Sequence, residues 1–370
     1  MKDQKQSTEK KLRQGYTTGS CATAATKAAL TALITKEEQT DATIYLPVGK
    51  FVTFQMEHCD FHENGVTVGV IKDAGDDPDA THGALIQATV SWKNTAGIEL
   101  DGGAGVGRAT KPGLPIEVGE AAINPVPRKM IRSTAEEVLT QFHIHQGIKV
   151  VISVPDGVEI AKKTLNGRLG ILGGISILGT RGIVVPFSTA AYKASIVQAI
   201  KVARASDCEH VAITTGGRSE KYAMQQLPNL SDEAFIEMGD FVGFTLKQCK
   251  RLGIKKVSMV GMMGKFSKVA QGVMMVHSKS APVDFGFLAQ VASEVGVKGE
   301  LIEEIEHANT ASQVGDMMVA NGFHSFFEVL CNYCCQQALQ EMSGGVDVDT
   351  TLYTLKGDLL GRAECYDESD

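Results

Sequence analysis

The sequence has no long hydrophobic run and no hydrophobic segment at its amino end. No uninterrupted apolar stretch approaches the roughly 18 residues that a membrane-spanning helix needs. Residues 1–11 are polar and lack the apolar core of a secretory signal peptide. We therefore expect a cytoplasmic protein.

Basic residues are in the minority. The chain has 36 Lys and Arg against 43 Asp and Glu, which gives a net charge of −7. Proteins that bind nucleic acid neutralise phosphates with a basic surface, so this balance argues against nucleic acid as the main partner. It does not exclude an anionic small molecule, because a local basic cluster can oppose the overall charge.

The cysteines do not form the pattern of a disulfide framework. Eight in 370 residues are too sparse for one. Cys331, Cys334 and Cys335 are close enough in sequence to suggest a metal or cluster site. However, Phe327, Cys331, Cys334 and Ala338 follow the spacing of one helix face, which favours core packing. We therefore predict no metal site.

The length of 370 residues suggests two domains. Short β-branched and aromatic runs over residues 42–110 predict strands. An alanine-rich run predicts a helix from about Cys21, capped by Thr18 or Ser20. We expect residues 1–188 to form an α+β domain.

After Pro186 the pattern changes to short apolar strands alternating with helices. We expect strands over 210–215 and 256–261 and a long helix over 232–252. Such alternation is typical of a parallel sheet covered on both faces. Residues 189–370 are therefore predicted to form an α/β domain.

Ligands of parallel sheets bind at the carboxyl ends of the strands. Here the first of the two strands runs into Gly216 and Gly217, and the second into Gly261 to Lys265. We expect a ligand at these two loops.

A second glycine-rich segment lies at residues 154–186, with glycines at 170, 173, 174, 179 and 182 among Ile and Leu. It is too apolar for a linker and too rich in glycine for an ordinary strand or helix. Glycine lets the backbone approach another group closely. That group is either a ligand, bound by free backbone N–H groups, or a neighbouring element that packs tightly against the segment. The sequence leaves both interpretations open.

An acidic loop over residues 72–83 carries Asp73, Asp76, Asp77 and Asp79. These carboxylates repel one another unless a metal ion, a ligand or nearby Lys and Arg compensate them. The loop lacks the liganding Glu of a calcium-binding EF-hand. A simply solvated loop is the other interpretation.

Residues 101–115 contain a pattern like the glycine fingerprint of dinucleotide-binding proteins. Pro112 and Pro115 cannot continue into the helix that receives the pyrophosphate, so that interpretation fails. What remains is a glycine loop with Arg108 and Lys111, followed along the chain by Arg128 and Arg168. Arginine pairs with carboxylates through charge-assisted, often bidentate hydrogen bonds, so these residues suit a ligand rich in carboxylates.

Six blocks of the sequence resemble the CbiD family. They include Gly-Tyr-Thr-Thr-Gly-Ser-Cys-Ala-Thr-Ala-Ala at 15–25 and Ala-Ile-Asn-Pro-Val-Pro-Arg at 122–128. The other blocks lie at 72–83, 105–114, 166–180 and 276–279. Together they span most of the chain in one order, with one small departure at Arg181, where the family pattern has Thr.

The resemblance implies methylation of cobalt-precorrin-5B at ring carbon 1, giving cobalt-precorrin-6A in anaerobic cobalamin (vitamin B12) biosynthesis. It implies S-adenosylmethionine as the methyl donor. It also implies an α+β first domain related to a permuted ribosomal S5-type domain, and an α/β second domain with a small parallel sheet.

On this interpretation the enzyme has to align donor and acceptor and exclude water, so no nucleophilic triad is required. We assign no catalytic residue. The acetate and propionate groups of the substrate suit Arg108, Lys111, Arg128 and Arg168. The donor needs backbone amides near its carboxylate and an acidic side chain near its ribose or amino group. The candidates are Gly173, Gly174, Gly216, Gly217, Asp76 and Asp77.

Two alternatives belong to other classes. A nicotinamide-dependent tetrapyrrole reductase also uses an α/β domain, but it needs a strand, a fingerprint and a helix in that order. A non-catalytic corrinoid-binding protein would keep the basic cluster and need no donor site.

Overall fold

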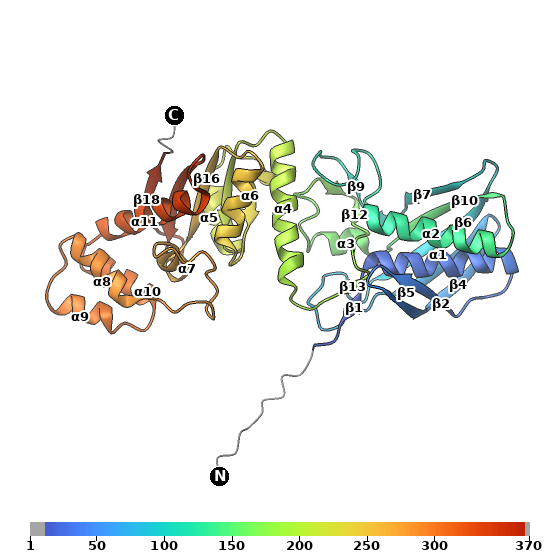
Figure 1. The fold of residues 1–370 in the computed structure, drawn as a ribbon, viewed down its shortest axis with the longest axis horizontal. Coiled ribbons are helices and arrows are strands. Elements are labelled where there is room, and N and C mark those ends of the chain that lie inside the picture. The colour runs from blue at the N-terminus through green and yellow to red at the C-terminus, as the bar shows by residue number, and fades with distance from the viewer. Residues whose placement is uncertain (1–11, 367–370) are drawn as a thin grey trace, which may run out of the picture. The chain divides into compact units, whose positions relative to one another are not determined.

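The computed structural model describes residues 12–366. The chain divides into two compact units, Met1–Ser188 and Thr189–Asp370, each with its own hydrophobic core. Figure 1 shows the first unit in blue to green and the second in yellow-green to red. The polar segment 1–11, on which the expectation about a signal peptide rests, lies outside the described residues. Between residues 12 and 366, no helix is both long and apolar enough to cross a bilayer.

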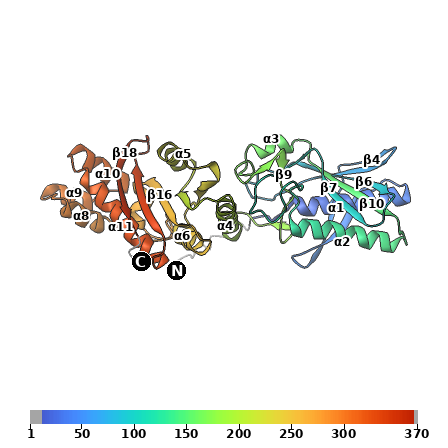
Figure 2. The same ribbon diagram turned by 90° about the horizontal axis from the view of Figure 1, so that it is seen from above.

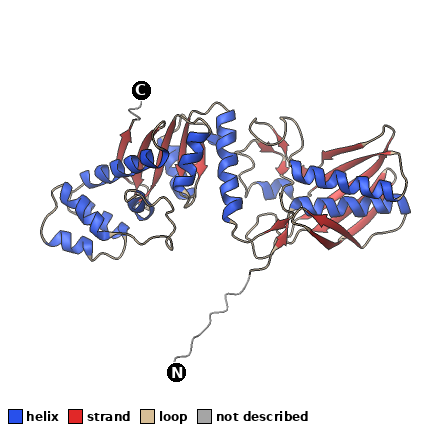
Figure 3. Cartoon of the chain, in the orientation of Figure 1, coloured by secondary structure: helices blue, strands red, loops and turns tan. Residues whose placement is uncertain are grey.

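The first unit is a mixed α+β fold. Its elements are β1 (Gly15–Tyr16), α1 (Thr18–Thr35), β2 (Asp41–Leu46), β3 (Lys50–Gln55), β4 (His58–His62), β5 (Gly65–Ile71), β6 (Leu85–Lys93), β7 (Ile98–Gly102), β8 (Gly105–Val106), β9 (Arg108–Ala109), α2 (Pro125–Gln141), β10 (Gly147–Ser153), α3 (Gly157–Ala161), β11 (Ile171–Leu172), β12 (Gly174–Ile175) and β13 (Ile183–Val184). The main sheet has the order β4-β5-β6-β10-β7 and is antiparallel except for the β10–β7 pair. Helix α1 packs on β5, β6 and α2, and Figure 3 shows both helices lying along the strands.

Helix α1 is built from alanine so that it can lie close to its neighbours. Ala22, Ala25 and Ala29 are completely buried between the sheet and α2. The helix begins at Thr18, and its cap is Thr17, whose side chain accepts a hydrogen bond from the N–H of Ser20. The predicted start near Cys21, capped by Thr18 or Ser20, was therefore a few residues late.

The second unit is built on a sheet of order β15-β14-β16-β17-β18. Its elements are α4 (Thr189–Ala205), β14 (His210–Thr214), α5 (Gly217–Gln226), the 3₁₀ turn η1 (Asp232–Ala234), β15 (Phe235–Glu237), α6 (Val242–Arg251), β16 (Lys256–Met262), α7 (Met263–Val269), α8 (Phe285–Glu294), α9 (Glu300–Glu306), α10 (Ala311–Ala320), α11 (Ser325–Met342), β17 (Asp347–Tyr353) and β18 (Leu359–Cys365). The first four strands of the sheet are parallel, and β18 is antiparallel to β17.

Both faces of this sheet are covered, as the alternating pattern predicted. Helix α5 covers one face through a small cluster of Ala212, Ala223, Phe235 and Val260. Helices α4, α6 and α11 cover the other face and form the larger core. Figure 2 shows α5 and α6 on opposite sides of the sheet.

The predicted long helix over residues 232–252 is wrong. Phe235 and Ile236 are both buried, but on opposite faces of the sheet, as successive residues of a strand must be. Gly239 then takes a φ of 59°, which ends the strand before α6 begins. The apolar spacing of Phe235, Met238 and Val242 imitates a helix because a short buried strand and a helix follow each other directly.

The cysteine cluster lies in the core, as predicted. Cys331, Cys334 and Cys335 on α11 are completely buried. Burial raises the pKa of the Cys331 and Cys334 thiols well above the ordinary value. Protonated, inaccessible thiols are poor nucleophiles and poor metal ligands, so this cluster is packing.

We expect replacement of both Cys331 and Cys334 by serine to lower the free energy of unfolding by about 1–3 kcal/mol per site. The reason is that each serine buries a more strongly polar group than the thiol it replaces. Urea denaturation measures the change. Cys208→Ser, at a partly exposed thiol, is the control and should alter stability by less than about 0.5 kcal/mol. Equal losses in the two proteins would contradict the packing role.

Candidate functional site

The carboxyl edge of the second sheet has the topology that creates a ligand site. Strand β14 lies between β15 and β16, and the chain leaves β14 through α5 on one face and β15 through α6 on the other. The order of connection therefore reverses between β14 and β16, and ligands of open parallel sheets bind at such switch points. The predicted loop at Gly261 to Lys265 is absent, because α7 follows β16 directly. Lys265 of α7 reaches the end of β14, where its Nζ donates a hydrogen bond to the Thr215 carbonyl oxygen at 3.4 Å.

Gly216 and Gly217 form the loop between β14 and α5, and their backbone is open. A β-carbon on Gly217 would meet no atom within 4 Å, and one on Gly216 would meet only Glu237 Oε1, at 4.0 Å. Ser219 holds the loop, since its Oγ accepts the Thr215 N–H at 3.1 Å. The start of α5 is thus a fixed loop without bulky side chains, which lets a ligand approach the backbone.

Charged groups gather beside this loop. Asp240 forms an ion pair with Lys265 at 3.0 Å. Tyr192 of α4 is half-buried, and its pKa is raised to about 12 by burial and by the negative charges of Glu237 and Asp240. Tyr192 is therefore protonated at neutral pH. Tyr192, Glu237 and Lys265 come from three different elements and Asp240 from the connection between β15 and α6, and all lie at one edge of the sheet.

The glycine-rich segment of the first unit, residues 154–186, packs against other backbone at Gly174. Gly174 pairs in parallel with Gly105, and a β-carbon on Gly174 would collide with the Gly105 carbonyl. Gly105 has a φ of 69° and lies as tightly against Val154. Gly173 has a φ of 83° with no atom near the missing β-carbon, as in a turn. For Gly174 the structure favours a tight crossing of backbones over a ligand contact.

Lys and Arg side chains compensate the acidic loop. Asp73 pairs with Arg13, and Asp79 pairs at 2.6 Å with Lys72, which is only 1% exposed. Burial disfavours the ionised form of Asp79, but the Lys72 ammonium and the hydrogen bonds from Lys72 and Thr81 outweigh burial and lower its pKa. Two of the four carboxylates of the loop thus have a cationic partner within the first unit.

The other two aspartates of the loop accept hydrogen bonds from backbone N–H groups. Asp76 Oδ2 accepts the N–H of Arg13 at 2.7 Å, and Asp77 Oδ1 accepts the N–H of Phe187 at 2.9 Å. Both therefore fasten segments that are distant in sequence. They lie in the first unit with Gly173 and Gly174, whereas Gly216 and Gly217 lie in the second.

The structure brings the four predicted basic residues into one neighbourhood. Arg108 lies on strand β9, which pairs with β11, a strand that begins three residues after Arg168. Arg108 also forms an isolated β-bridge with Ala121. Lys111 packs against Gly170, where a β-carbon would meet its side chain. The segments that carry Arg108, Lys111, Arg128 and Arg168 thus lie next to one another, and these four residues are called the basic cluster below.

Carboxylates orient two of these arginines. Arg108 Nη2 donates to Asp101 at 2.9 Å, and Arg128 Nη2 donates to Glu120 at 3.0 Å. Burial opposes ionisation of Asp101, but the Gly102 N–H and the Arg108 guanidinium outweigh it and lower the pKa. A cavity of about 350 Å³ lies beside Arg128, lined by residues 114–117, Glu120 and Pro125. The Arg128 guanidinium is therefore held in position next to open space.

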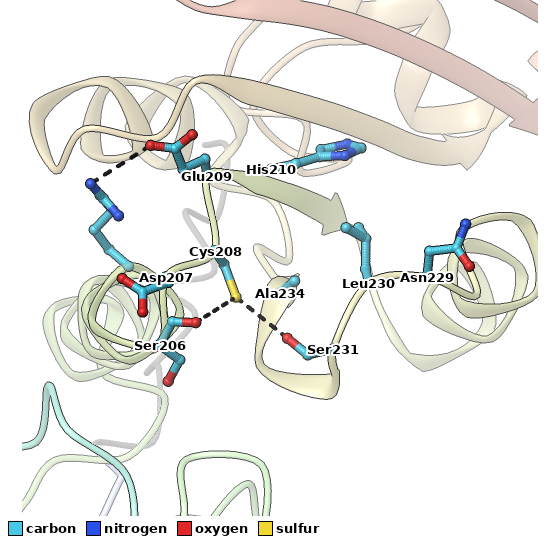
Figure 4. Close-up of a pocket in the computed structure, with 10 residues that line it drawn as sticks. Ser206, Asp207, Cys208, Glu209, His210, Asn229, Leu230, Ser231 and Ala234 are labelled. Atoms are coloured by element: carbon cyan, nitrogen blue, oxygen red, sulfur yellow. Dashed lines mark hydrogen bonds and ion pairs between the residues drawn. The ribbon is translucent and has the colours of Figure 1, made fainter.

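A larger cavity, of about 570 Å³, lies at the other end of β14 (Figure 4). Its lining includes Cys208, His210 and Ser231, and Cys208 Sγ lies 3.4 Å from Ser231 Oγ. Burial is the main reason that the pKa of His210 is lowered. This cavity is at the amino end of the strand, opposite to the edge where parallel sheets bind ligands. Across residues 12–366, no three His, Cys, Asp or Glu side chains are placed to hold a metal ion.

Sequence reasoning missed Glu237 and Asp240, because both fell inside the presumed helix over 232–252. The available signal was Gly239-Asp240, a turn-forming pair that follows the apolar run 234–236 after Glu237 and Met238. Interpreted as a strand end, that pair would have placed two carboxylates at the carboxyl edge of the sheet.

Known proteins similar to this chain cover both units. Family models described as CbiD and as CbiD, C-terminal domain match residues 5–186 and 275–364. A relative from Priestia megaterium, named cobalt-precorrin-5B C(1)-methyltransferase, is 72% identical over 96% of each chain. A relative with the same name from Geobacillus kaustophilus is 69% identical over 98% of each chain. Another from Leptospira interrogans is 43% identical over 96% of this chain and 97% of the relative. The crystal structure of a cobalamin biosynthesis protein (cbiD) from Archaeoglobus fulgidus is 31% identical, with a TM-score of 0.39, covering 68% of this chain and 78% of that one.

We expect Gly174→Ala to lower the free energy of unfolding by about 1–3 kcal/mol or more, because the added methyl group overlaps a backbone carbonyl that cannot move aside easily. Chemical denaturation measures the loss. Gly167→Ala is the matched control: its β-carbon meets no atom within 4 Å, so its stability should stay within about 0.5 kcal/mol of wild type. If Gly174→Ala is as stable as this control, the tight crossing is not the reason for glycine at that position.

Proposed function

The chain belongs to the CbiD family, and we propose that it is a cytoplasmic enzyme that transfers a methyl group from S-adenosylmethionine to ring carbon 1 of cobalt-precorrin-5B, giving cobalt-precorrin-6A. The main support for this proposal is that relatives named for the reaction match nearly the whole chain. Relatives named for that reaction match 96–98% of this chain, so both units belong to the matched protein.

We place the methyl donor at the switch point of the second unit. Gly216 and Gly217 are open to an approaching ligand, and the N–H groups at the start of α5 suit its carboxylate. In the first unit, by contrast, Gly174 serves a backbone crossing, Gly173 a turn, and Asp76 and Asp77 hold backbone N–H groups. The second unit therefore fits the donor better.

We place the carboxylates of the tetrapyrrole at the basic cluster of Arg108, Lys111, Arg128 and Arg168. Arg108 donates to Asp101 and to the carbonyl oxygens of Gly102 and Gly119. Arg128 donates to Glu120 and to the Ile123 carbonyl oxygen. A guanidinium carries five N–H groups, so each arginine keeps donors for a substrate carboxylate. Charged hydrogen bonds from such pre-oriented groups fix both the position and the rotation of the substrate.

The sulfonium of the donor supplies an activated methyl group, and the acceptor is an electron-rich ring carbon. The protein therefore has to hold the two in line and exclude water, which is where positioning contributes most of the rate. Neither the buried thiols of α11 nor an added metal has a part in this scheme. We also propose that the first unit is related to a permuted ribosomal S5-type domain, a relation supported by the family resemblance of its sequence.

The decisive experiment follows the methyl group. Incubated without oxygen with cobalt-precorrin-5B and methyl-labelled S-adenosylmethionine, the protein should place one label on ring carbon 1 without nicotinamide, added metal or thiol. Mass spectrometry and carbon NMR of the product measure this. Tight binding of the tetrapyrrole without label would favour a non-catalytic corrinoid-binding protein. A requirement for nicotinamide would favour a reductase.

Replacement of Arg108, Arg128 or Arg168 by alanine should raise the apparent substrate KM and leave donor affinity unchanged. Each lost charged hydrogen bond is worth about 1.5–3 kcal/mol, or roughly 10- to 150-fold. Arg251→Ala, at an exposed site in the last turn of α6, is the control and should behave as wild type. If all three variants share the wild-type KM, the basic cluster does not bind substrate.

A further inference from the structure

Strand β15 ends in a carboxylate that faces the glycine loop. Glu237 is the last residue of β15 and pairs with Thr214, the last residue of β14. Side chains alternate along a strand, so Glu237 points to the same face as Phe235, and Thr214 to the same face as Ala212. Phe235 and Ala212 both belong to the small cluster under α5. The Glu237 carboxylate and the Thr214 hydroxyl therefore lie next to each other, beneath the first turn of α5.

The half-buried carboxylate of Glu237 has no hydrogen-bond or ion-pair partner in the described part of the chain. Its Oε1 lies 4.0 Å from the position of a β-carbon on Gly216, so it borders the open loop directly. The neighbouring Asp240 differs, because Lys265 neutralises it at 3.0 Å. A half-buried carboxylate without donors is costly, which indicates that something outside the chain supplies them.

Thr214 gives a second and independent indication. It is 0% exposed, and its Oγ1 has no hydrogen-bond partner among residues 12–366. Buried hydroxyls almost always find a partner in the folded protein. Two unsatisfied polar groups, one an acceptor only and the other a donor and acceptor, thus lie side by side at the carboxyl edge of the sheet.

Resting on the donor site proposed above, we infer that Glu237 accepts hydrogen bonds from the ribose hydroxyl groups of S-adenosylmethionine, with Thr214 beside it. Two adjacent hydroxyls match the two oxygens of one carboxylate. Glu237 is on β15, the strand next to the one that leads into the glycine loop. Neighbouring strands lie about 4.8 Å apart, which is about the size of one ribose. An acidic residue about 20 positions after the glycine loop has this role in other dinucleotide-binding sheets, and Glu237 follows Gly217 by 20.

Glu237→Gln tests the inference, because it keeps the size of the side chain and removes the charge. Calorimetry with S-adenosylhomocysteine and its 2′-deoxy analogue gives the readout. Wild type should prefer the ribose form, and the variant should bind S-adenosylhomocysteine about 10- to 100-fold more weakly and lose that preference. Glu304→Gln, an exposed carboxylate on α9, is the matched control and should behave as wild type.

Thr214→Val is a second variant that does not depend on the charge. It removes an unsatisfied buried hydroxyl, so the free protein should be at least as stable as wild type while its affinity for S-adenosylhomocysteine falls. 5′-Methylthioadenosine, which keeps the ribose and lacks the amino acid, should lose as much affinity in Glu237→Gln as S-adenosylhomocysteine does.

Three results overturn the inference. Wild-type affinity of Glu237→Gln, or a retained preference for the 2′-hydroxyl, would show that the carboxylate does not contact the ribose, and the proposed methyl transfer would stand. Normal binding of 5′-methylthioadenosine with weakened S-adenosylhomocysteine would move Glu237 to the amino acid part of the donor. If wild type binds neither compound and transfers no label, the proposed function itself fails.

Discussion

The donor site depends on the position of one strand. Parallel neighbours can be joined only by crossover connections, and these are right-handed almost without exception. Because β14 has parallel partners on both sides, the helix that follows it and the helix that follows β15 must cover opposite faces. The chain therefore leaves the carboxyl ends of β14 and β15 toward opposite faces of the sheet. An open site is thus a consequence of strand order, before any side chain is chosen.

Charge compensation explains why one carboxylate at this edge differs from the others. In the acidic loop of the first unit, Asp73 and Asp79 meet Arg13 and Lys72, and in the second unit Asp240 meets Lys265. Each of these pairs is satisfied within the chain and can stabilise the fold in the free protein. Glu237 lacks such a partner, so its charge is available to a ligand. Carboxylates are common in this acidic protein, so a carboxylate alone does not indicate a site. A carboxylate without a partner in the chain does.

Sequence patterns predicted the elements whose signals are local. The alanine-rich helix α1, the parallel sheet of the second half and the packing of Cys331 and Cys334 all follow from periodicity and composition. The short strand β15 was lost because three residues give too little periodicity to distinguish a buried strand from a helix turn. Glu237 was therefore not recognised as a site residue, because its place at the edge of the sheet follows only from its place at the end of β15. The approach of the segment after Arg168 to the segment of Arg108 could not be predicted either, because it depends on the non-local pairing of β9 with β11.

Glycine shows why composition alone does not separate a binding loop from a packing contact. Gly174 and Gly217 both follow apolar segments, and the sequence alone does not distinguish them. At Gly174 the missing β-carbon makes room for the chain's own carbonyl, whereas at Gly217 the space holds no atom of the protein within 4 Å. The first glycine is needed for folding and the second is not, so a methyl group at Gly217 should be tolerated by the free protein. The open backbone at Gly217 leaves room for a ligand to approach, which is the use that we propose for it.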